Sequence, residues 1–251
     1  MKKIFTLFFL MTALFATAQE TADTMYIYRS DNTVKRIAVA DIDSVTFVAP
    51  VSVVTPPAAT QYEAVDLGLS VKWATCNVGA SKPEDYGGYY AWGETEEIED
   101  YSWSTYKWCN GSKDTMTKYC TSSSYGTVDN KTTLDPEDDV ARVKWGGSWR
   151  MPTLAEQDEL RNKCTWTWTT KNGVKGYTVT GPNGNSIFLP AAGGCNDSTL
   201  FDCGSSGCYW SSSLNDGINT RAFSLDLDSS NYNLGGFARR YIGLSVRPVS
   251  E

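Results

Sequence analysis

Two glycine turns set between short runs of β-forming residues constrain the fold most. The runs cover residues 165–170, 176–180 and 186–190, and the turns Asn172-Gly173 and Pro182-Asn183-Gly184 separate them. Asn-Gly between such runs is a strong hairpin signal, because a tight hairpin turn needs positive φ angles that both residues tolerate. The sequence therefore predicts antiparallel hairpins here. Further strands are expected at residues 209–212, 221–227 and 242–249, the last one returning beside the first strand of the domain.

One helix is predicted ahead of these hairpins. Thr153 can serve as its N-cap, and Glu156, three residues later, completes a capping box. Leu154 and Leu160 are expected to face inward, and the helix should end near residues 162–164. The fold class that follows is α+β, with antiparallel sheets, one or two helices and long loops.

The first 18 residues have the three parts of a secretory signal peptide. Lys2 and Lys3 precede an apolar run over residues 4–16, and Ala16-Thr17-Ala18 is a small-x-small cleavage site. The apolar run is too short for a membrane-spanning helix, which needs about 20 residues. The chain is therefore expected to be exported, to the periplasm, the cell surface or the medium, without a transmembrane segment.

Three further parts are predicted after the signal peptide. Residues 19–48 read as a small β unit, with strands at 25–28, 34–39 and 45–48. Residues 49–60 form a Pro-rich linker, and residues 61–251 form the large domain. An isolated hairpin is marginal in water, so the β unit is expected to dock on a partner.

The amino-acid composition disfavours several classes of function. The net charge is −7, which argues against nucleic acid, because phosphate binding needs clustered Lys and Arg. The chain has no histidine, and so it lacks the usual general base and metal ligand. Catalytic carboxylate pairs stay possible, but the 29 acidic residues give no basis for choosing one; Glu94 and Asp226 merely border aromatic motifs. We expect no enzyme and no metal centre.

Seven cysteines follow the predicted signal peptide. In an exported protein such cysteines indicate disulfides first. The candidate pairs are Cys109 with Cys120, Cys203 with Cys208, and Cys76 with Cys164, and the odd count leaves at least one thiol over. A zinc site at residues 195, 203 and 208 is the disfavoured alternative, since paired CxxC spacing is absent.

Five segments carry a resemblance to a known family: residues 65–79, 89–94, 145–153, 209–212 and 245–248. Over about residues 62–249 the chain resembles the major paralogous domain of Fibrobacter succinogenes, a family of exported domains also abundant in gut Bacteroidetes. The family is similar to the C-type lectin-like fold, which formylglycine-generating enzymes share. The resemblance implies a curved antiparallel sheet, one or two helices, termini close together and a long loop region that carries binding.

The resemblance raises two kinds of chemistry that the residues only partly match. Lectins of that type hold calcium with a Glu-Pro-Asn or Gln-Pro-Asp motif and a later Trp-Asn-Asp motif. Residues 195–197 and 214–216 match these motifs only in part. Acidic residues at 135, 137–139 and 94–100 could supply oxygen ligands, so calcium stays possible, although no cofactor is predicted. Formylglycine-type oxidation would need a reactive cysteine pair, for which Cys203 and Cys208 are the nearest candidates.

Loop aromatic residues are the predicted ligand site. Flat rings can cover the apolar face of a sugar while polar groups take its hydroxyls. One group is Trp103, Tyr106, Trp108 and Asn110, and a second, expected in a C-terminal loop, is Tyr232, Arg239 and Arg240. The alternative is that these rings pack the loops onto the sheet.

The favoured function is an extracytoplasmic binding or adhesion module for a glycan or protein ligand. The alternative is a structural component of a bacterial surface assembly, which would attach to its partner through the N-terminal β unit by strand addition.

Overall fold

The computed structural model describes residues 24–28, 34–38 and 62–251. The chain separates into two compact units, Met1–Ala58 and Ala59–Glu251. In the first unit β1 (Thr24–Tyr28) pairs antiparallel with β2 (Val34–Ala38). The predicted signal peptide, the third strand of the β unit and the linker lie outside the described residues.

The predicted hairpins are present in the second unit. β5 (Thr165–Lys171), β6 (Val174–Thr180) and β7 (Ser186–Pro190) form an antiparallel sheet in that order. Asn172 and Gly173, which link β5 to β6, have φ angles of 49° and 87°. Positive φ at both central residues is the conformation that a two-residue hairpin turn requires, so the Asn-Gly signal predicted this turn correctly.

The chain ends beside the first strands of the domain. β3 (Ala64–Val65) and β13 (Val249–Ser250) flank β4 (Lys72–Ala74), with Val249 opposite Trp73. The strand predicted over residues 242–249 is mostly absent. Leu244 bridges to Tyr90 and Ser245 to Tyr209, so successive residues pair with different segments and no continuous ladder forms.

The central sheet is β10 (Ser206–Leu214), β11 (Arg221–Asp228) and β12 (Tyr232–Arg239), joined antiparallel in that order. The sequence predicts a loop at the segment that forms β12, and the structure corrects this prediction. Its Gly235-Gly236 pair weakens the local β signal, but pairing with β11 makes it a strand, with an irregularity between Ser224 and Leu225.

The helix α2 (Leu154–Lys163) begins as predicted. The Glu156 amide donates to Thr153 Oγ1 at 3.3 Å, and the Thr153 amide donates to Glu156 Oε2 at 2.8 Å. A second helix, α1 (Val140–Trp145), follows a 3-10 helix over Pro136–Asp138. Asp139 is the N-cap of α1, and its Oδ1 accepts from two amides of the first turn.

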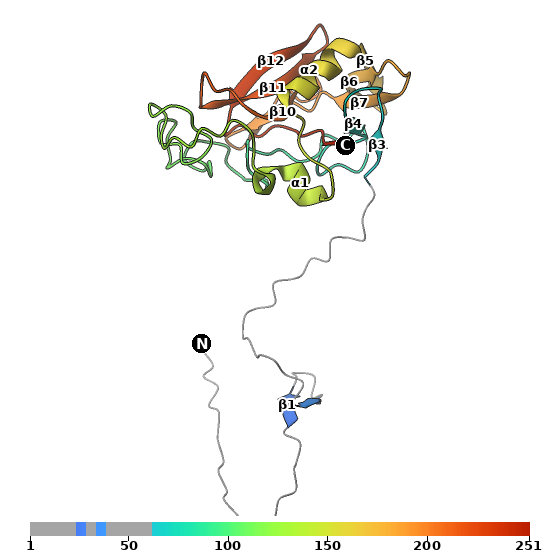
Figure 1. Ribbon diagram of the computed structural model, residues 1–251. Helices are drawn as coiled ribbons and strands as arrows, with labels where there is room; N and C mark the ends of the chain where they lie inside the picture. The colour runs from blue at the N-terminus through green and yellow to red at the C-terminus, as the bar shows by residue number, and fades with distance from the viewer. Residues whose placement is uncertain (1–23, 29–33, 39–61) are drawn as a thin grey trace, which may run out of the picture. The chain divides into compact units, whose positions relative to one another are not determined.

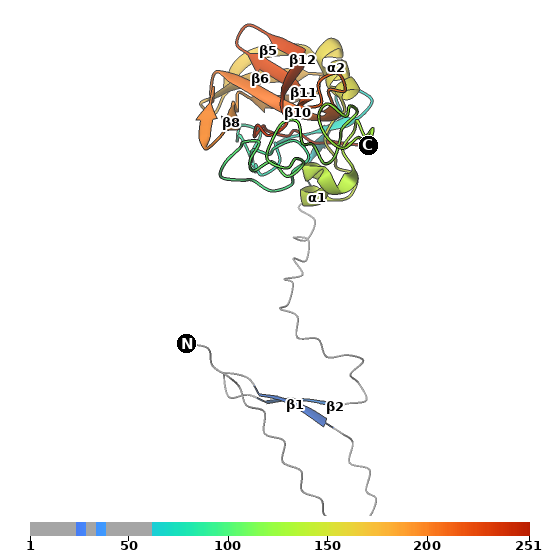
Figure 2. The same ribbon diagram turned by 90° about the vertical axis from the view of Figure 1, so that its left-hand side faces the viewer.

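Two hydrophobic clusters pack on opposite faces of the central sheet. The helices α1 and α2 lie on opposite sides of that sheet (Figures 1 and 2). On one face, Leu225 and Leu227 pack against Leu160 of α2 and against residues of β6 and β7. On the other face, Trp210 packs against residues of α1 and of the irregular segment over residues 75–135, which includes Trp92. In this α+β domain the central sheet therefore lies between two layers. One consists of α2 with β6 and β7, and the other, called the loop layer below, consists of α1 and the irregular segment. Among the described residues, no helix is long and apolar enough to cross a membrane.

Candidate functional site

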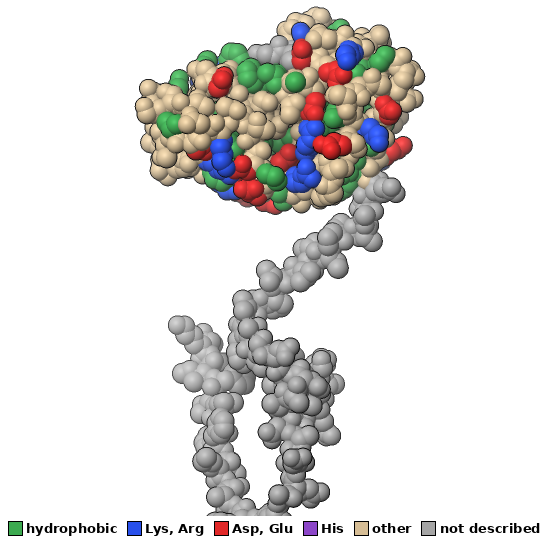
Figure 3. All heavy atoms as spheres, viewed as in Figure 1, with side chains coloured by type: hydrophobic (Ala, Val, Ile, Leu, Met, Phe, Trp, Pro, Cys, Tyr) green, Lys and Arg blue, Asp and Glu red, His purple; other side chains and the backbone are tan. Residues whose placement is uncertain are grey.

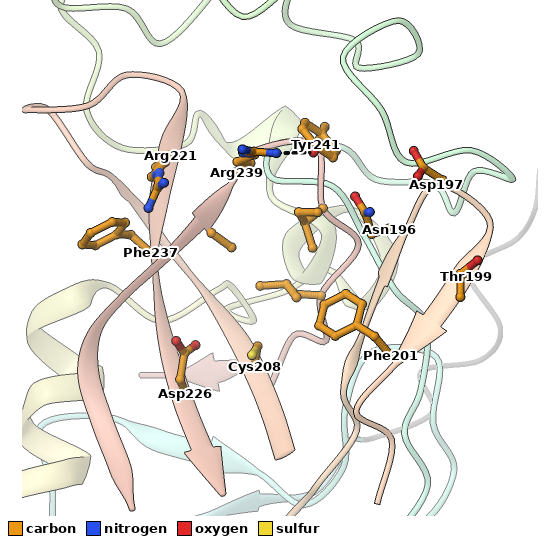
Figure 4. A pocket seen from close by; sticks show the side chains of 13 residues that line it. Asn196, Asp197, Thr199, Phe201, Cys208, Arg221, Asp226, Phe237, Arg239 and Tyr241 are labelled. Atoms are coloured by element: carbon orange, nitrogen blue, oxygen red, sulfur yellow. Dashed lines mark hydrogen bonds between the residues drawn. The ribbon is translucent and has the colours of Figure 1, made fainter. Parts of the chain in front are cut away.

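A pocket of about 690 Å³ lies between the central sheet and a small hairpin (Figure 4). The hairpin is β8 (Gly194–Asn196) and β9 (Thr199–Phe201). Residues from the hairpin, from all three strands of the central sheet and from the segment after β12 line the pocket: Asn196, Asp197, Thr199, Phe201, Cys208, Arg221, Asp226, Phe237, Ala238, Arg239, Tyr241, Ile242 and Leu244. Ligand pockets in proteins typically have volumes of roughly 300–1,000 Å³.

Apolar side chains occupy the middle of the pocket. The Phe201 ring points inward from β9, toward Cys208 on β10 (Figure 4). Phe201 and Ile242 are partly buried and pack against the core beneath, of which Leu244 is a member. The pocket therefore has an aromatic surface on a packed base, which holds the ring in place.

The hairpin presents polar groups at the rim. Asn196 pairs with Thr199, and Asp197 turns the chain with a φ of 50°. Tyr101 fixes this turn, because its amide and carbonyl bond to the carbonyl and amide of Asp197 at 2.9 and 3.1 Å. Asn196 Oδ1 is buried and has no hydrogen-bond partner among the described residues. A buried acceptor without a donor is costly, so a ligand donor would be stabilised there.

Two arginines stand at the end of the sheet that borders the pocket. Arg221 on β11 is directly opposite Arg239 on β12. The Arg221 guanidinium lies over the Phe237 ring at 4.8 Å, and Arg239 Nη1 donates to the Tyr241 hydroxyl at 3.1 Å. Within the described part of the chain, neither arginine forms an ion pair.

Asp226 lies low in the pocket beside Cys208. Its Oδ1 accepts from the Ser224 hydroxyl at 2.8 Å. Burial raises the pKa of the Asp226 carboxyl, although hydrogen bonds from Ser224 and Cys208 act against the rise. Gly236 on the adjacent strand leaves room for this carboxyl, because a Cβ at that position would overlap it.

We expect Asp226→Asn to stabilise the protein at neutral pH. Because the pKa of Asp226 is raised on folding, the folded state holds this proton more tightly than the unfolded state does. The stability of the natural protein therefore falls as pH rises above the unfolded pKa of about 3.8. Denaturant midpoints should be higher for the variant at pH 7 and equal for the two proteins at pH 3.

Asp197→Asn is the matched control, since it removes an exposed carboxylate from the same pocket. It should leave the midpoint unchanged at both pH values. A midpoint for Asp226→Asn below that of the natural protein at pH 7 would contradict the raised pKa.

Of the seven residues predicted to bind ligand, Arg239 alone lines the pocket. Tyr106 and Arg240 are buried, with 2% and 0% of their surfaces exposed. The Arg240 Nε donates to the Tyr106 hydroxyl at 2.9 Å, and that hydroxyl donates to the Trp92 carbonyl at 2.7 Å. The structure corrects the prediction for both residues: they hold the loop layer together and are closed to a ligand.

The other predicted residues lie away from the pocket. Trp108 donates its Nε1 hydrogen to the Gly93 carbonyl at 2.7 Å, so its ring anchors the irregular segment. Tyr232 stacks on Trp166 with ring centroids 4.7 Å apart. Trp103 reaches the pocket indirectly, because its ring packs edge-on against Tyr241 at 4.8 Å. Asn110 is exposed in the loop.

The seven cysteines, all within the described residues, are free thiols. The structure thus corrects the three predicted disulfides. The Cys109 thiol donates to the Trp103 carbonyl and the Cys120 thiol to the Ser122 carbonyl, both at 3.1 Å. Cys208 is turned toward Asp226, whereas Cys203 contacts the Ala192 carbonyl at 3.3 Å. The third pair is also separated: the Cys76 thiol donates to the Ala80 carbonyl at 3.5 Å, while Cys164 caps the end of α2.

The acidic cluster near α1 already contains a cation. Asp135, Glu137 and Asp138 could group around a metal ion, but the Lys118 ammonium lies 2.6 Å from both Asp135 Oδ2 and Asp138 Oδ2. On the face drawn in Figure 3, acidic and basic side chains are interspersed in the same way. The cluster therefore forms a salt-bridge network.

Sequence reasoning missed most of the pocket. In the sequence, residues 195–197 match a lectin calcium motif only in part, Phe201 carries no local signal, and Asp226 merely borders an aromatic motif. Comparisons of the chain with protein-family models, with curated proteins and with solved structures found no match.

Proposed function

We propose that the second unit is an extracytoplasmic module that binds a glycan in the pocket between β8–β9 and the central sheet. The observation that carries this proposal is the pocket itself: a ring, Phe201, at its middle and polar side chains around its rim. A sugar has an apolar face and a ring of hydroxyl groups. A site that binds one pairs an aromatic surface with a few polar groups at fixed positions.

A glycan fits this pocket better than a protein surface does. Protein interfaces bury roughly 800 Å² on each partner over a broad patch, whereas this site is a concave pocket of about 690 Å³. The unpartnered Asn196 Oδ1 and the exposed Thr199 hydroxyl suit the many donors and acceptors of a sugar. Export through the N-terminal signal belongs to the same proposal.

We also propose that the domain has the C-type lectin-like fold and belongs with the exported domains that its sequence resembles. The pairing of the last strand, β13, with β4, the second strand of this unit, supports this. The mixed α+β architecture and the long irregular segment agree with it. Binding would then use a different surface from the loop aromatics expected from sequence.

A glycan microarray probed with residues 19–251 tests the function. Thr199→Trp should fill the pocket and weaken binding of any hit by about tenfold or more, which corresponds to about 1.4 kcal/mol. Leu200→Trp is the matched control: Leu200 is 56% exposed and absent from the pocket lining, because neighbouring strand residues point to opposite sides. The Leu200→Trp variant should retain binding. Binding should also survive a calcium chelator, because the Lys118 ammonium occupies the acidic cluster.

Three outcomes would contradict the proposal. Loss of binding in Trp108→Ala but not in Thr199→Trp would move the site to the irregular segment. A blank array from a folded protein would favour an assembly role for residues 19–48. Release of reducing sugar from a bound glycan would identify an enzyme.

A further inference from the structure

Arg221 and Arg239 are directly opposite each other on neighbouring strands, so two like charges are paired there. Directly opposite residues on antiparallel strands have Cβ atoms about 5 Å apart, and like charges there are destabilising. The chain carries a net charge of −7, so acidic partners are plentiful. Even so, no carboxylate of the described residues forms an ion pair with either guanidinium.

The surroundings orient both guanidinium groups and leave them positive. Arg221 lies over the Phe237 ring, and Arg239 donates to the Tyr241 hydroxyl. Tyr241 is itself held by the Trp103 ring. These partners are a ring and a hydroxyl, so they restrict the side chains without removing charge. Both arginines line the pocket, at the same end of it (Figure 4).

We propose that the pocket selects an acidic glycan, whose sugar carboxylate is held between Arg221 and Arg239. This inference rests on the proposed glycan-binding function and names its substrate class. Guanidinium groups bind planar carboxylates through paired, charge-assisted hydrogen bonds. The sugar ring next to the carboxylate then lies toward Phe201, and its hydroxyls meet Asn196 and Thr199.

The acidic residues of the pocket are compatible with this ligand. Asp197 stands on the hairpin, across the pocket from Arg221 (Figure 4), where it can accept from sugar hydroxyls. Asp226 lies at the far end from the arginines, beside Cys208.

Isothermal titration with paired ligands tests the inference. The probes are trigalacturonate, a hyaluronan tetrasaccharide and sialyllactose, each compared with its own methyl ester, which keeps the sugar and removes the charge. At least one acid should bind about tenfold or more tightly than its ester. The preference should shrink as ionic strength rises, because the arginines are at the rim and salt screens them.

Two double variants separate the pair from general charge. Arg221→Gln with Arg239→Gln should abolish the preference for the acid. Lys82→Gln with Lys175→Gln removes the same charge from exposed sites outside the pocket and should retain it. Arg221→Lys with Arg239→Lys keeps the charge but loses the planar fork, and should restore only part of the preference.

The outcomes distinguish the two proposals. Equal binding of acids and esters, with both weakened by Thr199→Trp, would overturn the acidic preference and leave glycan binding standing. A preference that survives in the Arg-to-Gln double variant would also overturn it. Equally tight binding of a sulfated galactan oligosaccharide would contradict the carboxylate geometry. No binding of any acid probe would overturn the acidic preference, and array hits whose binding is unchanged in Thr199→Trp would overturn glycan binding in this pocket as well.

Discussion

Arg240→Ala is expected to destabilise the second unit by about 3–5 kcal/mol, because it strips several buried acceptors of their donor at once. The Arg240 guanidinium donates to the carbonyls of Lys118, Tyr119 and Asn219 at 3.0–3.1 Å. It also lies over the Trp92 and Tyr106 rings, at 5.0 and 5.2 Å from their centroids. One side chain therefore ties the irregular segment to the central sheet.

Thermal unfolding followed by near-UV circular dichroism measures this effect. A loss of that size lowers the melting temperature of a domain of this length by about 10 °C. Arg239→Ala is the matched control, one residue away but exposed, and should change stability by no more than about 0.5 kcal/mol. If Arg240→Ala melted with the natural protein yet lost glycan binding, Arg240 would be a ligand residue, as the sequence had suggested.

Trp210→Ala is expected to cost a similar amount, about 3–5 kcal/mol, which is typical of emptying a large core site. Trp210 is fully buried in the core between the central sheet and the loop layer. Its Nε1 donates to the Tyr90 carbonyl, and Trp92 Nε1 donates to the Ser211 carbonyl, both at 2.8 Å. The two indoles thus cross-link the loop layer to β10.

Urea unfolding of Trp210→Ala and Trp210→Phe separates the two contributions. Phenylalanine keeps most of the ring but removes one of the two donors to the Tyr90 carbonyl, which still accepts from the Leu244 amide at 3.1 Å, a loss of about 0.5–1.5 kcal/mol. The alanine variant should therefore be clearly the less stable of the two. Equal stability of the two variants would mean that the hydrogen bond, and not the ring volume, dominates at this site.

Local signals predicted the parts of the fold that depend on neighbours in sequence. The Asn172-Gly173 turn and the capping box of Thr153 and Glu156 form as expected, because each needs only residues a few positions apart. β12 was missed, since Gly235-Gly236 weakens its local preference and its partner β11 supplies the ladder. Helix α1 was not located from the sequence, because its six residues, Val140–Trp145, are too few to show a helical period.

The candidate site could not be assembled from sequence for a related reason. Phe201 and Asn196 come from one hairpin, whereas Arg221 and Arg239 come from strands that are paired only in the folded sheet. Composition could show that aromatic residues are abundant, but it could not show which rings are exposed. Trp108 and Tyr106 are used to pack the loop layer, and Phe201 lines the pocket.

The sequence by itself determined the α+β class, the hairpin turns, the start of α2 and the absence of histidine, because these follow from residue type and short spacing. Only the tertiary structure decided the roles of Arg239 and Arg240. Consecutive residues of a strand point to opposite sides of the sheet. The segments that pack on each side are distant in sequence. One arginine therefore borders a pocket, and its neighbour is buried among Trp92, Tyr106 and Tyr119.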